Sequence, residues 1–225
     1  MYSFQATCER LGVPIAQEKT EGPVTTITFL GLEIDSVIDQ LLPCLTRVCT
    51  SYEAVLFKVC FTVAFFGFLR VGEFTGISRS ATGANLRIND VVVRRQSLCR
   101  HLRLFFRSSK TDQLARGCYI IIPEAAGSPL CPVDATVNHL AVMPHSGEAF
   151  FCAFDGRQLT RRAFTEVLRK CLSFLNLRFA SHSFRIGAAT SAAMAGFDVS
   201  AIQRMGRWAT DTHTRYVRIN MLDEL

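Results

Sequence analysis

The segment at residues 59–69, VCFTVAFFGFL, is the most hydrophobic stretch of the chain and restricts the fold more than any other feature. It supplies about half of the roughly 20 apolar residues that a membrane-spanning helix needs, and Lys58 and Arg70 flank it. Apolar side chains recur at helical spacing over residues 46–66, and neither Gly nor Pro interrupts them before Gly67. We therefore predict a buried helix over residues 46–66 and no membrane span.

Arg70 directly follows this apolar stretch and needs an anionic partner, because an unpaired charge buried among apolar side chains is costly. Glu73 lies three residues further on, within reach across one helical turn. Two interpretations are open. The two residues form a purely structural ion pair, or Glu73 holds the guanidinium in place for an incoming phosphate.

Three strand-like segments follow at residues 86–94, 99–107 and 118–122. The first two alternate apolar and polar side chains across a short polar link, and the third is rich in β-branched residues. This pattern predicts an antiparallel three-stranded sheet. Lys110 lies in the polar loop at residues 108–117 and is expected at a hairpin tip, although most exposed loop lysines are merely solvated.

The remaining pattern is helical. Pro132 suits a first helical position and begins a helix that is expected to run through residue 142. Thr160 is a suitable N-cap for an amphipathic helix over residues 161–175. Further helices are expected after the cap Ser181 and over residues 199–205 and 210–218. The predicted fold class is α+β, a mainly helical domain with a small three-stranded antiparallel sheet.

Positive charge is concentrated near the C-terminus. The whole chain has 225 residues and a formal net charge of +6, but residues 157–218 alone contain eleven Lys or Arg against three acids. Such a concentration is typical of proteins that bind nucleic acid. The alternative is a solvated basic helix face without a polyanionic partner.

The nine cysteines favour a reducing compartment, because their number is odd and no C-x-x-C pair occurs. Neither a disulfide framework nor a zinc site is indicated, and we expect no metal or cofactor. The N-terminus shows no basic region followed by an apolar core, so no signal peptide is expected.

Six residues supply what cleavage of a phosphodiester without a metal requires. Two arginines can hold the non-bridging oxygens, and a tyrosine can attack if a cationic setting lowers its pKa from about 10. Taken singly, His182 is an ordinary helix N-terminal histidine, Trp208 a core residue and Tyr216 one of four tyrosines. Taken in order, the candidate catalytic residues are Arg70, Lys110, His182, Arg185, Trp208 and Tyr216.

The segments FGFLRVGEF, HSFR and GRW, together with the hairpin lysine and Tyr216, resemble the ordered motifs of the tyrosine recombinase (phage integrase) family over about residues 44–218. HSFRIGAAT with GRW…RY is similar in particular to the recombinases of DIRS-like retrotransposons. The interval from Trp208 to Tyr216 is eight residues, about one shorter than in many bacterial members.

The resemblance implies a role for each residue. Tyr216 is the nucleophile that forms a 3′-phosphotyrosyl bond with DNA, and Arg70 and Arg185 bind the scissile phosphate. Lys110 protonates the 5′-hydroxyl leaving group, and His182 assists proton transfer or holds the phosphate. Trp208 stands where most members have His and some have Trp, and its indole N–H can donate one hydrogen bond but cannot shuttle protons. Glu73 supports Arg70.

Residues 1–36 differ in kind from the remainder. The run LGVPIAQEKTEGPVTTITFLGLEID resembles the end of the palm region of a retrotransposon reverse transcriptase, without that enzyme's catalytic carboxylates. An ordinary strand with a loop is the alternative. We divide the chain into this remnant at residues 1–36 and a tyrosine recombinase catalytic domain at residues 41–225.

Two functions are expected from these observations. The first is a DNA breaking–rejoining enzyme of retrotransposon origin, and the second is a catalytically idle DNA-binding remnant of such an element. Either one acts on double-stranded DNA in the nucleus, away from membranes, as a homo-oligomer on DNA. Only about 40 residues precede the first helix of the catalytic domain, so the helical core-binding domain of the family is not recognised. We expect weak DNA binding and no efficient recombination from this chain alone.

Overall fold

The computed structural model describes most of the chain between residues 28 and 208. Three predicted catalytic residues lie outside the described residues: Lys110, His182 and Tyr216. Residues 1–27 also lie outside them, and so does the expected helix over residues 210–218, of which only position 217 is described. The described ranges are 28–29, 32–76, 86–96, 99–107, 117–144, 147–175, 183–208 and 217.

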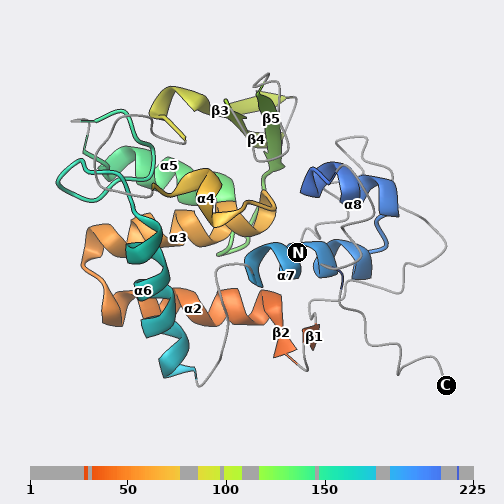
Figure 1. Ribbon diagram of the computed structural model, residues 1–225, viewed down its shortest axis with the longest axis horizontal. Helices are drawn as coiled ribbons and strands as arrows, with labels where there is room; N and C mark the ends of the chain where they lie inside the picture. Colours follow the sequence, from red (N-terminus) through yellow and green to blue (C-terminus); the bar gives the residue numbers. More distant parts are fainter. Residues whose placement is uncertain are drawn as a thin grey trace.

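Helix α3 (Ser51–Phe66) is the buried centre of the fold, as the hydrophobic segment predicts. It contacts α2 (Ile34–Val48), α5 (Pro132–Val142) and α7 (Ser183–Met194) (Figure 1). The sequence predicted one helix over residues 46–66, but residues 46–48 belong to α2 and α3 begins at Ser51.

The cause of this difference is a capping box. The Thr50 side chain accepts a hydrogen bond from the Glu53 N–H, and the Glu53 carboxylate accepts one from the Thr50 N–H. This exchange pairs two amide groups that a helix N-terminus otherwise leaves without partners, so a new helix begins here.

Helix α2 packs on α3 and on α6 (Arg161–Phe174) through buried side chains such as Leu41 and Leu45. It runs without interruption across residues 36–41, where the sequence was divided into two parts. A small antiparallel pair, β1 (Thr28–Phe29) and β2 (Leu32–Glu33), precedes it. The division into a remnant and a catalytic domain stays a prediction.

The predicted three-stranded antiparallel sheet is confirmed. Its strands β3 (Val91–Gln96), β4 (Cys99–Phe106) and β5 (Cys118–Pro123) lie in that order, and Leu102 of β4 pairs with Val93 on one side and Ile122 on the other. Leu102, Leu104, Phe106 and Ile122 are buried on the inner face.

The first strand begins at Val91 rather than at residue 86. Residues Ile88–Asp90 form a 3₁₀ turn instead, in which the Asp90 carboxylate accepts from the Arg87 N–H and pairs with Arg107. The side chain of Asp90 therefore fixes a turn where the alternating pattern predicted strand.

The C-terminal helices follow the predicted pattern closely. Thr160 caps α6 by accepting from the Ala163 N–H, and Phe164 and Leu168 of α6 are buried. Helix α7 is followed by α8 (Val199–Gly206). Among the helices that the structure describes, none is long and apolar enough to cross a membrane.

Candidate functional site

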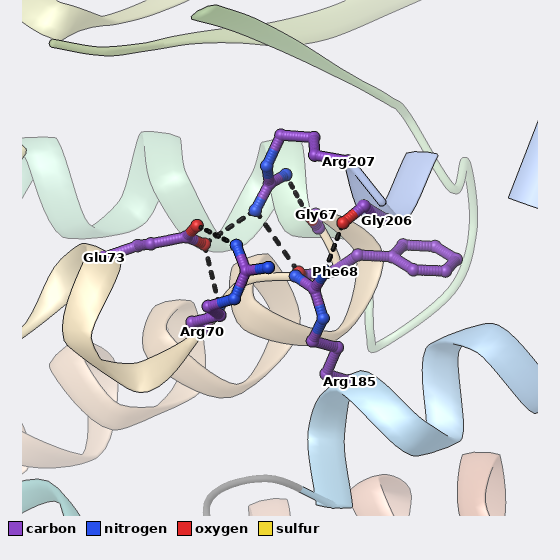
Figure 2. A network of polar contacts seen from close by, with 7 residues as sticks. All are labelled: Gly67, Phe68, Arg70, Glu73, Arg185, Gly206 and Arg207. Carbon is purple, nitrogen blue, oxygen red and sulfur yellow. Dashed lines mark hydrogen bonds and ion pairs between the residues drawn. The ribbon is translucent and has the colours of Figure 1, made fainter. Parts of the chain in front are cut away.

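Four segments that are distant in the sequence meet at one polar site. They are the turn at Gly67 and Phe68 after α3, the four-residue helix α4 (Val71–Phe74) with Arg70 before it, helix α7, and the C-terminal end of α8. Figure 2 shows the side chains that they bring together. We use the name arginine cluster for Arg70, Arg185, Arg207 and Glu73. The carboxylate of Glu73 pairs with both Arg70 and Arg207.

Glu73 ties two of the arginines together. Its Oε1 pairs with Arg70 Nη1 at 3.1 Å, and its Oε2 pairs with Arg207 Nη2 at 2.6 Å. Oε2 also accepts from the Arg70 backbone N–H at 2.8 Å. The predicted pair of Arg70 and Glu73 is thus confirmed. The side chain of Glu73 is 7% exposed and that of Arg70 is 24% exposed, so Arg70 is the partner that faces outward.

Arg185 is completely buried. Its Nη1 donates to the Phe68 carbonyl at 2.7 Å, and its Nη2 donates to the Gly206 carbonyl. Its guanidinium lies over the Trp208 ring, 4.4 Å from the ring centroid, in a cation–π contact. A buried guanidinium in this setting is held by backbone carbonyls and by an aromatic face.

Arg207 has an unusual backbone conformation. It ends α8 with φ 55° and ψ 44°, in the left-handed region that residues other than glycine rarely adopt. Its Nη1 donates to the Gly67 carbonyl at 3.2 Å, and its Nη2 donates to the Phe68 carbonyl at 3.4 Å. Phe68 also has a positive φ, 51°. Two strained residues therefore meet at one carbonyl group, and strain of this kind gathers at functional sites.

Gly206 makes room for the indole of Trp208. A Cβ atom on Gly206 would lie 1.7 Å from Cζ3 of Trp208, which no real contact permits. Trp208 is 8% exposed, and its indole meets the Phe68 ring edge-on. Trp208 thus belongs to the hydrophobic core and borders the site, with the face of its indole toward Arg185.

Among the residues that the structure describes, the arginine cluster carries three positive charges and one negative charge, that of the Glu73 carboxylate. An excess of two positive charges in a partly buried place favours an anion, and planar guanidinium groups match the oxygens of a phosphate. No group of three or more His, Cys, Asp or Glu that could hold a metal ion occurs in the part of the chain that the structure describes.

The structure thus brings together four of the predicted site residues, Arg70, Glu73, Arg185 and Trp208. The roles assigned to them stay predictions, as do those of Lys110, His182 and Tyr216, which lie outside the described ranges.

The sequence reasoning did not select Arg207. The signal for it was the interval to the tyrosine, because counting from Arg207 to Tyr216 gives nine residues where Trp208 gives eight. The interval from Trp208 had been recognised as about one residue short of the family pattern.

Part of the chain is similar in sequence to known proteins. The model of the phage integrase family matches residues 127–222. An integrase/recombinase XerD homolog from Selenomonas ruminantium is 29% identical over 143 residues, which are 60% of this chain and 41% of that protein.

Solved structures extend the likeness to the fold. The XerH site-specific recombinase bound to difH substrate aligns with a TM-score of 0.60 and 14% identity, over 83% of this chain and 50% of that one. A λ integrase dimer bound to a COC′ core site aligns with a TM-score of 0.54 and 15% identity, over 83% of this chain and 49% of that one.

The chain has the fold of a tyrosine recombinase catalytic domain. The family match over residues 127–222 and the likeness to the XerD homolog are sequence similarities to the phage integrase (tyrosine recombinase) family that agree with this fold. The chain spans about half, or less, of the length of each of these relatives.

Proposed function

We propose that this chain is a DNA breaking–rejoining enzyme, a site-specific recombinase or integrase that acts through a 3′-phosphotyrosyl intermediate. The observation that carries the proposal is the arginine cluster within a tyrosine recombinase catalytic domain fold: Arg70 and Arg207 pair with the Glu73 carboxylate, and Arg185 donates to the Phe68 carbonyl that also accepts from Arg207. Its excess positive charge suits the non-bridging oxygens of one phosphodiester and the charge that grows on them in the transition state.

In the proposed reaction the Tyr216 hydroxyl oxygen attacks the scissile phosphorus. A bond forms between this oxygen and phosphorus, and the bond from phosphorus to the 5′-oxygen breaks. Lys110 gives the 5′-oxygen its proton, while His182 assists removal of the tyrosine proton or holds the phosphate. The covalent phosphodiester retains the bond energy, so the reverse attack rejoins the strand without a cofactor.

Arg70 and Arg185 are proposed to bind the scissile phosphate from different depths. Arg70 is partly exposed and can meet a phosphate oxygen directly. Arg185 is buried and donates to two carbonyls, so its contact with the phosphate requires that one of these hydrogen bonds be exchanged. Trp208 supports Arg185 through the face of its indole.

The proposed substrate is double-stranded DNA, and the proposed working form is a homo-oligomer on that DNA. The segment at residues 157–218 favours this partner, because it contains eleven Lys or Arg and only three acidic residues. The likeness to recombinases that were solved on DNA, one of them as a dimer, supports the same proposal.

The finer proposal is an origin in a DIRS-like retrotransposon, with a reverse-transcriptase-like remnant at residues 1–36 and action in the nucleus. It rests on the resemblance of HSFRIGAAT and GRW to recombinases of that type and of the N-terminal run to a polymerase palm. The genomic sequence on both sides of the coding region tests it, because reverse-transcriptase motifs should lie immediately upstream of residue 1.

The test of the enzymatic proposal is the capture of a covalent adduct. The 225-residue chain is incubated with nicked duplexes randomised around the nick, so that cleavage releases a short fragment that cannot return. We expect a protein–DNA adduct that resists denaturation and disappears in Tyr216→Phe. The absence of an adduct from the whole pool would contradict the proposal.

Full burial of Arg185 favours a second candidate, a catalytically idle DNA-binding remnant. Such a protein binds duplex DNA with an affinity that falls steeply as salt rises, because bound cations are released from the phosphates. The second candidate predicts this binding without an adduct, and equal affinity for the wild-type chain and Tyr216→Phe.

A further inference from the structure

Arg207 is the residue that connects the two predicted phosphate-binding arginines. Its Nη2 pairs with Glu73 Oε2, and the other oxygen of the same carboxylate pairs with Arg70. The same Nη2 donates to the Phe68 carbonyl, which also accepts from Arg185. Figure 2 shows these contacts as one continuous network, in which dashed lines join Arg207 to Glu73 and to the Phe68 carbonyl.

The contacts of Arg207 point toward the protein rather than toward a ligand. Both of its Nη atoms donate to acceptors of the chain, and its side chain is 14% exposed, against 24% for Arg70. Arg70, by contrast, has Glu73 Oε1 as the only side-chain acceptor of its guanidinium among the residues described. Arg70 thus has donors left for a phosphate oxygen.

Arg207 also limits how Glu73 can bind Arg70. A carboxylate facing one guanidinium tends to take it with both oxygens, in two parallel hydrogen bonds. Here Oε2 is occupied by Arg207 Nη2 and by the Arg70 backbone N–H, so only Oε1 is left for the Arg70 guanidinium. The ion pair with Arg207 prevents Glu73 from covering the face of Arg70 that a phosphate needs.

The backbone at Arg207 is built for this contact. Its left-handed conformation ends α8 and is held by the hydrogen bond from its N–H to the Arg204 carbonyl and by the one from the Trp208 N–H to the Gln203 carbonyl. In a residue other than glycine this conformation is strained, and it persists only where contacts of the surrounding structure stabilise it. The side chain of Arg207 has such contacts with Glu73 and with the carbonyls of Gly67 and Phe68.

We propose that Arg207 is a positioning residue of the phosphate site: it holds Glu73 so that Arg70 offers its remaining donors to the scissile phosphate, and it joins this pair to the Phe68 carbonyl that holds Arg185. This inference rests on the proposed function and gives a role at the phosphate site to Arg207, which the sequence analysis did not select. The geometry of the arginine cluster alone motivates it.

The direct test compares Arg207→Lys with Arg204→Lys. Lysine keeps the charge but cannot reach Glu73 and two carbonyls at once. Arg204 is the matched control, because it is an exposed arginine of the same helix that donates to Ser200 Oγ. At saturating DNA we expect Arg207→Lys to lower the rate constant of adduct formation about tenfold while the Kd for DNA changes less than about twofold. Arg204→Lys should match the wild type, and an unchanged rate in Arg207→Lys overturns the proposal.

A second comparison separates positioning from a merely structural role. If Arg207 acts through Glu73, then Arg207→Lys has little further effect on the rate in a Glu73→Gln background, because coupled residues are not additive. Independent losses that multiply in the double variant would overturn the proposal. So would a lower Tm in Arg207→Lys with a normal rate per folded molecule.

A third measurement keeps this inference apart from the proposed function. If the wild-type chain forms no adduct, the enzymatic proposal fails, but binding of inorganic phosphate can still be measured by calorimetry at low ionic strength. We expect both Arg70→Ala and Arg207→Lys to weaken phosphate binding severalfold, with Arg204→Lys unchanged. Equal affinities of the wild type and Arg207→Lys, or no phosphate binding by the wild type, would contradict the role of Arg207.

Discussion

Three consecutive residues at the end of α8 meet three different physical demands. Gly206 leaves room for the indole of its neighbour, Arg207 adopts a left-handed backbone, and Trp208 lies with its face toward a buried guanidinium. The indole of Trp208 lies beside Gly206 and faces Arg185, so the short GRW segment contributes directly to the packing of the site.

Gly206→Ala is therefore expected to be severely destabilising. The added methyl group would lie 1.7 Å from a ring carbon of Trp208, and the indole cannot withdraw without leaving Arg185. Overpacking of this degree should cost about 3 kcal/mol or more of the free energy of unfolding. Thermal unfolding measures it, with Gly72→Ala as the control, because a Cβ atom at Gly72 meets nothing within 4 Å. Equal Tm values for the two variants would contradict this account of Gly206.

His139 is expected to make stability depend on pH. Burial lowers the pKa of its imidazole below the ordinary value of 6.5, and its Nε2 lies 2.9 Å from the Phe150 carbonyl oxygen, so the neutral ring donates there. Above pH 6.5 the ring is neutral in both the folded and the unfolded chain. Below it the unfolded chain takes up the proton first, so stability is lost as pH falls from 6.5 toward the folded pKa.

His139→Gln should remove this part of the pH dependence. The contribution of one histidine has a slope of at most about 1.4 kcal/mol per pH unit. Chemical denaturation at pH 7.5 and pH 5.5 measures the loss in each protein. The wild type should lose more stability than His139→Gln between these two values, and equal losses would show that His139 does not titrate as its burial requires.

Local spacing predicted one part of the site at the residue scale and missed another. Arg70 and Glu73 are three residues apart, and the apolar stretch before Arg70 demanded an anion, so their ion pair could be predicted. The pair of Arg207 and Glu73 spans 134 residues. It depends on a left-handed residue whose backbone no local pattern reveals, and only the interval to Tyr216 hinted at it.

At the scale of elements, side-chain caps decide where helices and strands begin. The helical pattern over residues 46–66 is real, yet the capping box of Thr50 and Glu53 divides it. The alternating pattern from residue 86 is also real, yet Asp90 closes a turn before the strand begins at Val91. Periodicity identified these elements, and particular polar side chains moved their ends.

Thr50→Ala is expected to destabilise the start of α3. The variant loses the acceptor for the Glu53 N–H, and replacing an N-cap threonine by alanine costs about 1 kcal/mol of the free energy of unfolding. Thr46→Ala is the control, because Thr46 is an exposed residue within α2 whose hydroxyl donates to the Pro43 carbonyl. Urea denaturation compares the two variants. A loss in Thr46→Ala as large as that in Thr50→Ala would argue against the capping box as the boundary.

At the scale of the whole molecule, the site is a product of the fold. Arg70 follows the end of α3, Arg185 lies on α7 and Arg207 at the end of α8, and the contact of Arg185 with Phe68 joins residues 117 positions apart. Composition and periodicity predicted the mainly helical α+β class and the sheet. Only the order of motifs, through a family resemblance, connected residues so far apart in the sequence.

We propose that the arginine cluster neutralises the charge of a scissile phosphate, and the most direct measurement removes that charge from the DNA. The randomised nicked duplexes are prepared with either a normal phosphate or an uncharged methylphosphonate at the nick-adjacent cleavage position. Arg70→Ala should form adduct at least about tenfold more slowly than the wild type on the phosphate, because it loses a charge-assisted contact. On the methylphosphonate the two proteins should react at similar rates. An equal deficit of Arg70→Ala on both substrates would contradict the claim.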